Sequence, residues 1–248
     1  MKAVFFSSKG PIRPTNEDGF YLKEVLMDQD QLAPEFRDLG DTAIVAVADG
    51  MGGGPGGREA AFLVLEKLTE LTQFPLDPAA PSRIANNLLE AARVLTLVAN
   101  KNPTLRHMGS TVAGLWLGET QGLVFNSGDS RVYRLRAGFL DLLTEDHSLV
   151  YELYLSGQIA EKDIATHPFK NILTSSIQDA PEEPRVFTRS IQLIPGDGFF
   201  LCTDGIWELL SREELESYLA LGPEVGAKNL TKAILKKAQD NLTFVWLY

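Results

Sequence analysis

Two segments, Ala43–Gly50 ("AIVAVADG") and Gly198–Gly205 ("GFFLCTDG"), decide the predicted fold. Each is an apolar run with the length of a buried strand, and each stops at an Asp-Gly pair. A strand end is a rigid place to hold a side chain, and the following Gly lets the backbone turn sharply. The sequence therefore predicts that Asp49 and Asp204 leave the core at its edge, from two strands far apart in the chain.

Further acidic residues stand at other predicted strand ends. Asp240 opens the apolar run 242–248, and Glu17 with Asp18 precedes a predicted strand at 20–22. If these ends meet, five carboxylates share a small volume, which is costly unless protons or cations intervene. Carboxylate oxygens suit hard divalent ions such as Mg²⁺ and Mn²⁺. Each acid alone is typical of a turn or a solvated loop, so the whole set carries this hypothesis.

Composition narrows the possible classes of protein. The chain has 248 residues, 44% of them hydrophobic, so it can build a sizeable core. This length favours a single domain that spans residues 1–248. A net charge of −10 argues against a nucleic-acid binder. No apolar run approaches the roughly 20 residues of a membrane span, and the N-terminal patch is too short for a signal peptide. We therefore expect a cytoplasmic protein with no membrane contact.

The lone cysteine, Cys202, fits a reducing compartment because it has no partner for an internal disulfide. Cysteine-dependent phosphatases place an Arg six residues after the nucleophile, where this chain has Glu208. We interpret Cys202 as a small buried core thiol. The three histidines are scattered, so no cluster with zinc-like spacing is present, and we interpret His147 and His167 as structural.

Secondary-structure signals alternate irregularly along the chain. Apolar runs between Gly-rich turns predict strands, at 4–7, 20–22, 42–48, 111–117, 122–127, 131–135, 186–193, 199–202 and 242–248. Helical periodicity predicts helices, at 58–71, 82–100 (with Ser82 as N-cap), 148–157, 213–219 and 224–237. The polar stretch 29–41 is interpreted as a surface excursion. Strict β-α alternation is absent, which predicts an α+β fold, a β-sandwich of two antiparallel sheets flanked by helix pairs.

Eight segments appear in the order found in a known family. They are "RPTNED" (13–18), "VADGMGG" (47–53), "GSTVAGL" (109–115), "NSGDSRVYRLR" (126–136), "LTEDHSLV" (143–150), "HPFKNILT" (167–174), "FFLCTDGIWE" (199–208) and "DNLTFVWL" (240–247). On these motifs, the chain resembles the metal-dependent protein phosphatases, the type 2C serine/threonine phosphatases, in their short bacterial form.

The resemblance implies a site for two Mn²⁺ or Mg²⁺ ions at one edge of the sandwich. Asp49 would bridge both ions. The carbonyl of Gly50 and the carboxylate of Glu17 would help to hold one ion, and Asp204 with Asp240 would hold the other.

Three further residues gain roles from the same resemblance. Asp18 would orient bound water beside the ions, and Arg13 would grip the substrate phosphate with its planar guanidinium. Asp129 matches the aspartate that can join Asp204 at a third, weaker metal position.

The implied reaction is hydrolysis of phosphoserine and phosphothreonine in proteins. A hydroxide between the two ions would attack phosphorus in line with the leaving oxygen, while the ions and Arg13 offset the developing charge. The expected partner is a phosphoprotein, the product of a cognate bacterial Ser/Thr kinase. We expect a monomer, with a flap near 149–170 at the substrate entrance.

The chain departs from the family pattern in a few places. Met51 stands where some relatives have a His, and Arg58 where a Glu is common. The segment with Lys170, Ser175 and Ser176, which follows the flap, lies where basic and small residues are usual. Substrate preference therefore remains open.

Two alternatives remain from the sequence. The glycines Gly52, Gly54 and Gly57 fit a dinucleotide fingerprint, but Asp49 would face the pyrophosphate and Pro55 removes an amide that could bind it. A phosphatase-like module that binds phosphoproteins without turning them over is the second alternative.

Overall fold

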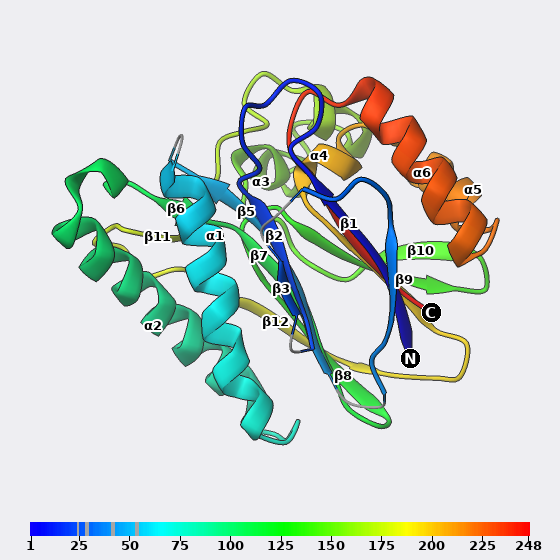
Figure 1. The fold of residues 1–248 in the computed structure, drawn as a ribbon, viewed down its shortest axis with the longest axis horizontal. Helices are drawn as coiled ribbons and strands as arrows, with labels where there is room; N and C mark the ends of the chain where they lie inside the picture. Colours follow the sequence, from blue (N-terminus) through cyan, green and yellow to red (C-terminus); the bar gives the residue numbers. More distant parts are fainter. Residues whose placement is uncertain (24, 28–29, 41–42, 53–54) are drawn as a thin grey trace.

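A computed structural model describes residues 1–23, 25–27, 30–40, 43–52 and 55–248. Two antiparallel sheets pack face to face, and helices cover the outer face of each (Figure 1). The sequence-based prediction of an α+β sandwich is confirmed.

The first sheet has six strands in the order β10-β9-β13-β14-β1-β4. Their bounds are Phe139–Leu142, Arg131–Arg136, Gly198–Cys202, Leu242–Leu247, Lys2–Ser8 and Glu35–Asp38. Both central strands, β13 and β14, are buried at every position because they have neighbours on both edges and layers on both faces. β13 ends two residues before Asp204, and β14 begins two residues after Asp240.

The second sheet has the order β11-β6-β5-β7-β8-β12, and the hairpin β2–β3 adds to β5. The bounds along this path are Ile177–Gln178, Gly109–Ser110, Ala43–Met51, Val112–Leu117, Gln121–Ser127 and Phe187–Gln192, with β2 at Asp18–Leu22 and β3 at Val25–Met27. The predicted strand at 42–48 lies in β5, although Thr42 is outside the described residues.

The sandwich has three packed layers of apolar side chains. Val45 and Val47 of β5 face the first sheet, while Ala46 and Ala48 face the helices α1 and α2. This alternation explains the continuous apolar run, because both faces of β5 are covered.

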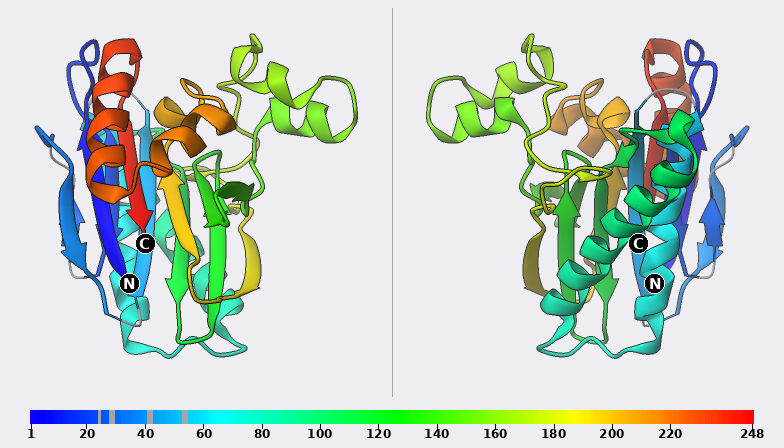
Figure 2. Two further views of the ribbon diagram at one scale, coloured as in Figure 1. Left: turned by 90° about the vertical axis from the view of Figure 1, so that its right-hand side faces the viewer. Right: turned by 90° about the vertical axis from the view of Figure 1, so that its left-hand side faces the viewer.

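Helices form the outer layers (Figure 2). The second sheet carries α1 (Pro55–Leu68) and α2 (Ala80–Lys101), followed by the short helical turns η1 (Thr69–Gln73) and η2 (Pro103–Leu105) respectively. The first sheet carries α4 (Asp204–Trp207), α5 (Arg212–Leu219) and α6 (Pro223–Lys237). None of the described helices is both long and apolar enough to span a bilayer.

The segment predicted as a flap contains α3 (Leu149–Leu155) and the turn η3 (Glu161–Thr166), and it projects from the body (Figure 2). Ser148 caps α3 by accepting from the N–H of Tyr151. Two ion pairs tie this segment to the helices of the first sheet: Glu161 with Arg212, at 2.6 Å, and Lys170 with Glu208.

Three local predictions are wrong. The helix predicted from Ser82 begins at Ala80, because the Asp77 carboxylate accepts from the N–H of Ala79 just before it. The predicted surface excursion contains β4, an exposed strand that pairs with β1 at the sheet edge. The backbone also does not turn sharply after Asp49, since β5 continues to Met51 by pairing with β6.

Candidate active site

Asp49 and Asp18 stand directly opposite each other on β5 and β2. Neighbouring strand residues fix the backbone at this point. The Asp49 N–H donates to Thr111 Oγ1 at 3.0 Å, and the Thr111 N–H donates to the Asp49 carbonyl at 2.8 Å. Ser110 Oγ donates to the same carbonyl at 3.0 Å. The motif "GSTVAGL" therefore supplies the residues that position Asp49.

Asp18 is almost completely buried, with 2% of its surface exposed. Thr203 Oγ1 donates to Asp18 Oδ2 at 2.8 Å, and the Thr243 side chain also hydrogen-bonds this carboxylate. Thr203 immediately precedes Asp204. The two sheets are thus joined by a hydrogen bond at the edge where the acids collect.

Asn241 connects the motif "RPTNED" to the start of the last strand. Its Oδ1 accepts from the Glu17 N–H at 2.8 Å, and its Nδ2 donates to the carbonyls of Thr15 and Lys9 at 2.9 and 3.2 Å. The neighbouring Asp240 lies beside Arg13, whose Nη2 donates to Asp240 Oδ2 at 2.6 Å. These contacts bring the segments of Arg13, Glu17 and Asp240 together.

The glycines after the two strand-end aspartates are required by close backbone approach. A Cβ on Gly50 would lie 2.0 Å from the carbonyl oxygen of Gly57 and 2.7 Å from that of Glu17. A Cβ on Gly205 would lie 1.9 Å from the carbonyl oxygen of Asn241. A side chain at either position would therefore push the acid-bearing segments apart.

The acids raise one another's pKa values. Burial is the largest cause for each, and the charge of Asp204 is the next cause for Asp18, Asp49 and Asp129, which all have pKa values well above the usual range. Burial and the charges of Glu208 and Asp240 raise the pKa of Asp204 to about 6, against a lowering hydrogen bond with Asp49. Asp18, Asp49, Asp129, Asp204 and Asp240 are here called the acidic cluster. Because their charges repel one another, these acids resist being ionised all at once.

Asp129 has 6% of its surface exposed and is anchored through its backbone. Its carbonyl accepts from Trp207 Nε1 at 3.0 Å, and the Arg131 guanidinium lies 3.7 Å from the centre of the Trp207 ring. Arg131 in turn donates to both oxygens of Asp146, at 2.6 to 3.1 Å. Trp207 thus holds the Asp129 backbone, and the Arg131–Asp146 ion pair supports Trp207 from behind.

The carboxylates of the acidic cluster lie near one another but are not yet arranged as metal ligands. Across the described residues, no three His, Cys, Asp or Glu side chains already stand at the spacing that holds a metal ion. One member, Asp240, is turned onto Arg13, and both side chains are exposed by about half, at 41% and 52%. The structure thus brings the predicted acids near one another, with Arg13 at their rim.

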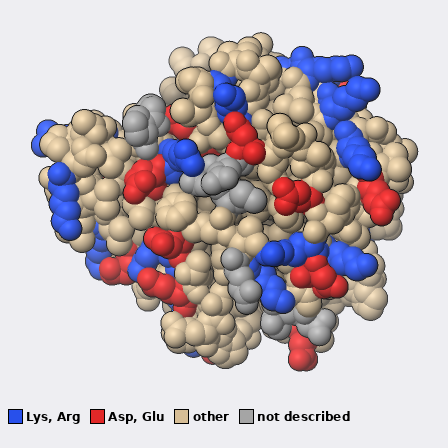
Figure 3. All heavy atoms as spheres, in the orientation of Figure 1, with Lys and Arg blue, Asp and Glu red and all other residues tan. Residues whose placement is uncertain are grey.

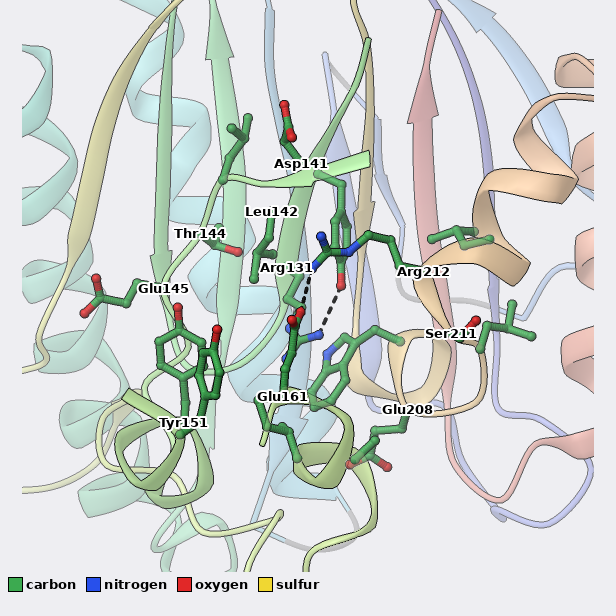
Figure 4. A pocket seen from close by; sticks show the side chains of 18 of the residues that line it. Arg131, Asp141, Leu142, Thr144, Glu145, Tyr151, Glu161, Glu208, Ser211 and Arg212 are labelled. Atoms are coloured by element: carbon green, nitrogen blue, oxygen red, sulfur yellow. Dashed lines mark hydrogen bonds and ion pairs between the residues drawn. The ribbon is translucent and has the colours of Figure 1, made fainter. Parts of the chain in front are cut away.

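A cavity of about 1070 Å³ lies between the segment 149–170 and the body (Figure 4). Tyr151 and Glu161 line it from the flap, and Glu208 and Arg212 from the opposite side. Trp207 also lines the cavity, and its indole N–H donates to the Asp129 carbonyl. The described residues that line the cavity include none of the acids predicted as metal ligands.

The other residues singled out in the sequence have local partners. Lys170 pairs with Glu208, and Ser175 Oγ accepts from the Arg185 N–H at 2.8 Å. Cys202 is completely buried, which raises the pKa of its thiol. His147 Nδ1 accepts from the Gly128 N–H at 3.3 Å. The predicted dinucleotide fingerprint includes Gly54, which lies outside the described residues.

Comparison with known proteins gives a family match over most of the chain. A sequence model described as protein phosphatase 2C matches residues 22–243. The chain belongs to this family. The resemblance predicted from the eight motifs is therefore confirmed, and with it the prediction of a protein phosphatase.

Relatives in the family match over nearly the whole chain. The serine/threonine phosphatase stp of Listeria monocytogenes is 30% identical over 98% of this chain and 94% of its own length. The crystal structure of Stp1 from Staphylococcus aureus superposes with a TM-score of 0.84 at 25% identity, covering 99% of this chain and 93% of that one. The catalytic domain of the phosphatase PstP, solved with two manganese ions, shares the fold at TM-score 0.78 and 24% identity, over 99% and 98% of the two chains.

Sequence reasoning missed the residues that hold the acids in place. Thr111, Thr203 and Asn241 all lie inside the quoted motifs, next to or opposite an acid. A Thr or Asn beside a strand-end Asp is a weak signal by itself. Their partners become visible only when distant strands are aligned.

Proposed function

We propose that this chain hydrolyses phosphoserine and phosphothreonine in proteins with the help of two Mn²⁺ or Mg²⁺ ions. The observation that carries the proposal is the meeting of Asp18, Asp49, Asp204 and Asp240 at one edge of the sandwich, from four separate segments. Relatives in the family give independent support. Listeria stp is named a serine/threonine phosphatase, and PstP was crystallised with two manganese ions.

The donor set fits hard divalent ions. Its members are carboxylates and a backbone carbonyl, which suit Mg²⁺ and Mn²⁺ better than softer metals. Asp49 lies within the electrostatic reach of Asp204, Asp18, Asp129 and Asp240. Cations would relieve this repulsion, which otherwise keeps protons on the acids.

The ligand roles follow the resemblance to the family, matched residue by residue. Asp49 is central and would contact both ions. Glu17 and the Gly50 carbonyl would serve one ion, and Asp204 with Asp240 the other. Asp129, held by Trp207, would serve a third ion together with Asp204. When bound, such a pair of ions lowers the pKa of a water and offsets negative charge on the phosphoryl group.

The remaining work falls to the chain's own side chains. Arg13 sits at the rim on Asp240, so it can leave this carboxylate for the substrate and pair with two phosphate oxygens. Asp18 is fixed by hydrogen bonds from Thr203 and Thr243, and its carboxylate would orient a water for attack. No residue is required to form a covalent intermediate.

The proposal includes the setting of the reaction. Residues 1–248 would form one phosphatase domain in which the segment 149–170 acts as a flap over the substrate. The substrate would be a phosphoprotein made by a Ser/Thr kinase. We expect a cytoplasmic monomer with no affinity for nucleic acid.

The test measures phosphate release from a phosphothreonine peptide by wild type, Asp204→Asn and Asp141→Asn. Asp141 is an exposed acid on β10 that pairs with Arg134 at 2.8 Å, and it serves as a control for the loss of one carboxylate outside the acidic cluster. We expect release that requires Mn²⁺, stops with a chelator, survives in Asp141→Asn and is lost in Asp204→Asn. Wild-type protein that binds the peptide but does not turn it over with Mn²⁺ would overturn the proposal.

A further inference from the structure

The exposed face of α6 carries three lysines in line, Lys228, Lys232 and Lys236, here called the lysine stripe. They are four residues apart, so they lie on one side of the helix. The buried residues of α6, such as Leu230 and Ile234, are on the opposite side. Figure 3 shows a line of basic side chains at its upper right, where Figure 1 places α6.

The lysine stripe is unpaired within the part of the chain that the structure describes. The neighbouring Lys237 lies 3.8 Å from Glu214, but no ion pair is present for a stripe lysine. Glu224 lies one turn before Lys228, but no ion pair joins these two described residues. Burial and the charge of Glu224 instead raise the pKa of Tyr248. The positive charge of the stripe is therefore available to a partner.

Helix stability does not account for the stripe. Lys236 lies in the last turn, where a cation favours the helix dipole, but Lys228 and Lys232 lie too far from that end. Like charges four residues apart destabilise a helix. The protein as a whole carries a net charge of −10, so three unpaired lysines in line are unusual for its composition.

The stripe leads toward the candidate active site. α6 ends at Lys237, and Asp240 follows three residues later beside Arg13. A Cβ on Gly10 would lie 3.6 Å from the Ala238 Cβ, so the loop that leads to Arg13 packs on the end of α6. The Lys236 end of the stripe is therefore the end nearer to Arg13.

We propose that the lysine stripe binds an acidic stretch of the phosphoprotein substrate. The proposal rests on the phosphatase activity proposed above and adds a class of substrate, one with a run of Asp or Glu away from the phosphorylated residue. Lys228 to Lys236 spans about 12 Å along the helix. About four residues of extended peptide cover that length, so a short acidic run is sufficient.

The test compares KM values for two phosphothreonine peptides that differ only in a distal run of four Glu or four Gln. A spacer of varied length separates this run from the phosphothreonine, on either side. The variant is Lys228→Gln, Lys232→Gln and Lys236→Gln together. The matched control removes three exposed charges near α2, on the other side of the sandwich: Arg93→Gln, Lys101→Gln and Arg106→Gln.

For wild type, we expect a lower KM with the Glu run at one spacer length. The stripe variant should raise that KM about five- to tenfold at low salt and leave kcat unchanged. The difference should shrink at high salt. The Gln-run peptide, a small chromogenic phosphate ester and the control variant should show no such change.

Equal KM values for the two peptides, in an enzyme that hydrolyses both, would overturn the stripe proposal and leave the phosphatase proposal standing. Absence of turnover with any phosphopeptide would instead overturn the phosphatase proposal. Sedimentation with phosphatidylserine vesicles that depends on the stripe, with equal KM values, would assign the stripe to a membrane surface and overturn its role in substrate binding.

Discussion

Two neighbouring groups of acids, in which Asp146 and Asp18 are buried and Asp49 is half-buried, have opposite surroundings in this protein. Asp146, with its side chain fully buried, accepts hydrogen bonds from Nε and Nη2 of Arg131. Asp18 and Asp49 instead face each other and Asp204, so like charge surrounds like charge. Burial raises the pKa of Asp146, while Arg131 lowers it. The first arrangement stabilises a fold, and the second leaves negative charge for a ligand to neutralise.

This difference separates structural from functional carboxylates on physical grounds. A buried acid that only supports the fold is expected with a cation of the chain's own. A buried acid among other acids weakens the fold unless something binds there.

The largest expected effect is on catalysis. Asp49→Asn should lower phosphopeptide turnover at saturating Mn²⁺ by roughly 10³-fold or more, because it removes the central carboxylate of the cluster. In urea unfolding with a chelator, the same variant should be as stable as wild type or more stable, since a repelling charge is gone. A large loss of stability would mean that Asp49 is a structural acid.

Asp146→Asn should show the reverse pattern in stability. It leaves Arg131, with only 12% of its side chain exposed, without a charged partner. Breaking a buried pair in this way costs about 3–5 kcal/mol of unfolding free energy. Urea titration measures this loss, with the exposed pair variant Asp141→Asn as control. A loss below 1 kcal/mol would erase the distinction between the two acid groups.

Mn²⁺ should stabilise the protein through the acidic cluster. At 100 times the dissociation constant, one bound ion adds about 2.7 kcal/mol, and a thermal-shift assay should report roughly 5–10 °C. Asp204→Asn should lose most of this shift, and Asp141→Asn should keep it. An equal shift in both variants would place the bound ion elsewhere.

The smallest effect concerns His147, which is a buried neutral base outside the acidic cluster. Burial, assisted by the charge of Arg185, lowers the pKa of His147 to about 4. Its contribution to stability is complete above the unfolded pKa of about 6.5 and is lost progressively as pH falls toward 4. At pH 5 the loss should be about 2 kcal/mol.

His147→Asn should remove that pH-dependent loss while keeping an acceptor for the Gly128 N–H. Urea unfolding at pH 7 and pH 5, both with chelator, measures the effect as a difference between the two proteins. The acids of the cluster contribute equally to the pH dependence of both proteins, so their contribution cancels in the difference. Parallel pH dependence in the two proteins would contradict the assigned state of His147.

The sequence predicted the parts of the fold that carry strong local patterns. Apolar runs identified β5, β13 and β14, because strands covered on both faces contain little else. It missed β4, whose four residues are all exposed and which is defined only by backbone pairing with β1. Alternation of apolar side chains gives no signal for such an edge strand.

For the site, the order of motifs identified the acids but not what holds them. Thr203 and Thr111 act across strands that are distant in the sequence, so their roles depend on register. The same applies to Gly50, which was predicted to allow a turn and instead allows the close approach of Gly57 and Glu17. Contacts between distant segments are the information that local sequence patterns lack.

The central claim is that the uncompensated acids capture a pair of divalent cations. Anomalous scattering from a crystal soaked in Mn²⁺ tests it most directly. We predict two peaks roughly 3.5–4 Å apart, with Asp49 between them and Asp204 and Asp240 beside one. Density that shows no ion among these carboxylates, at a Mn²⁺ concentration that supports turnover, would contradict the account.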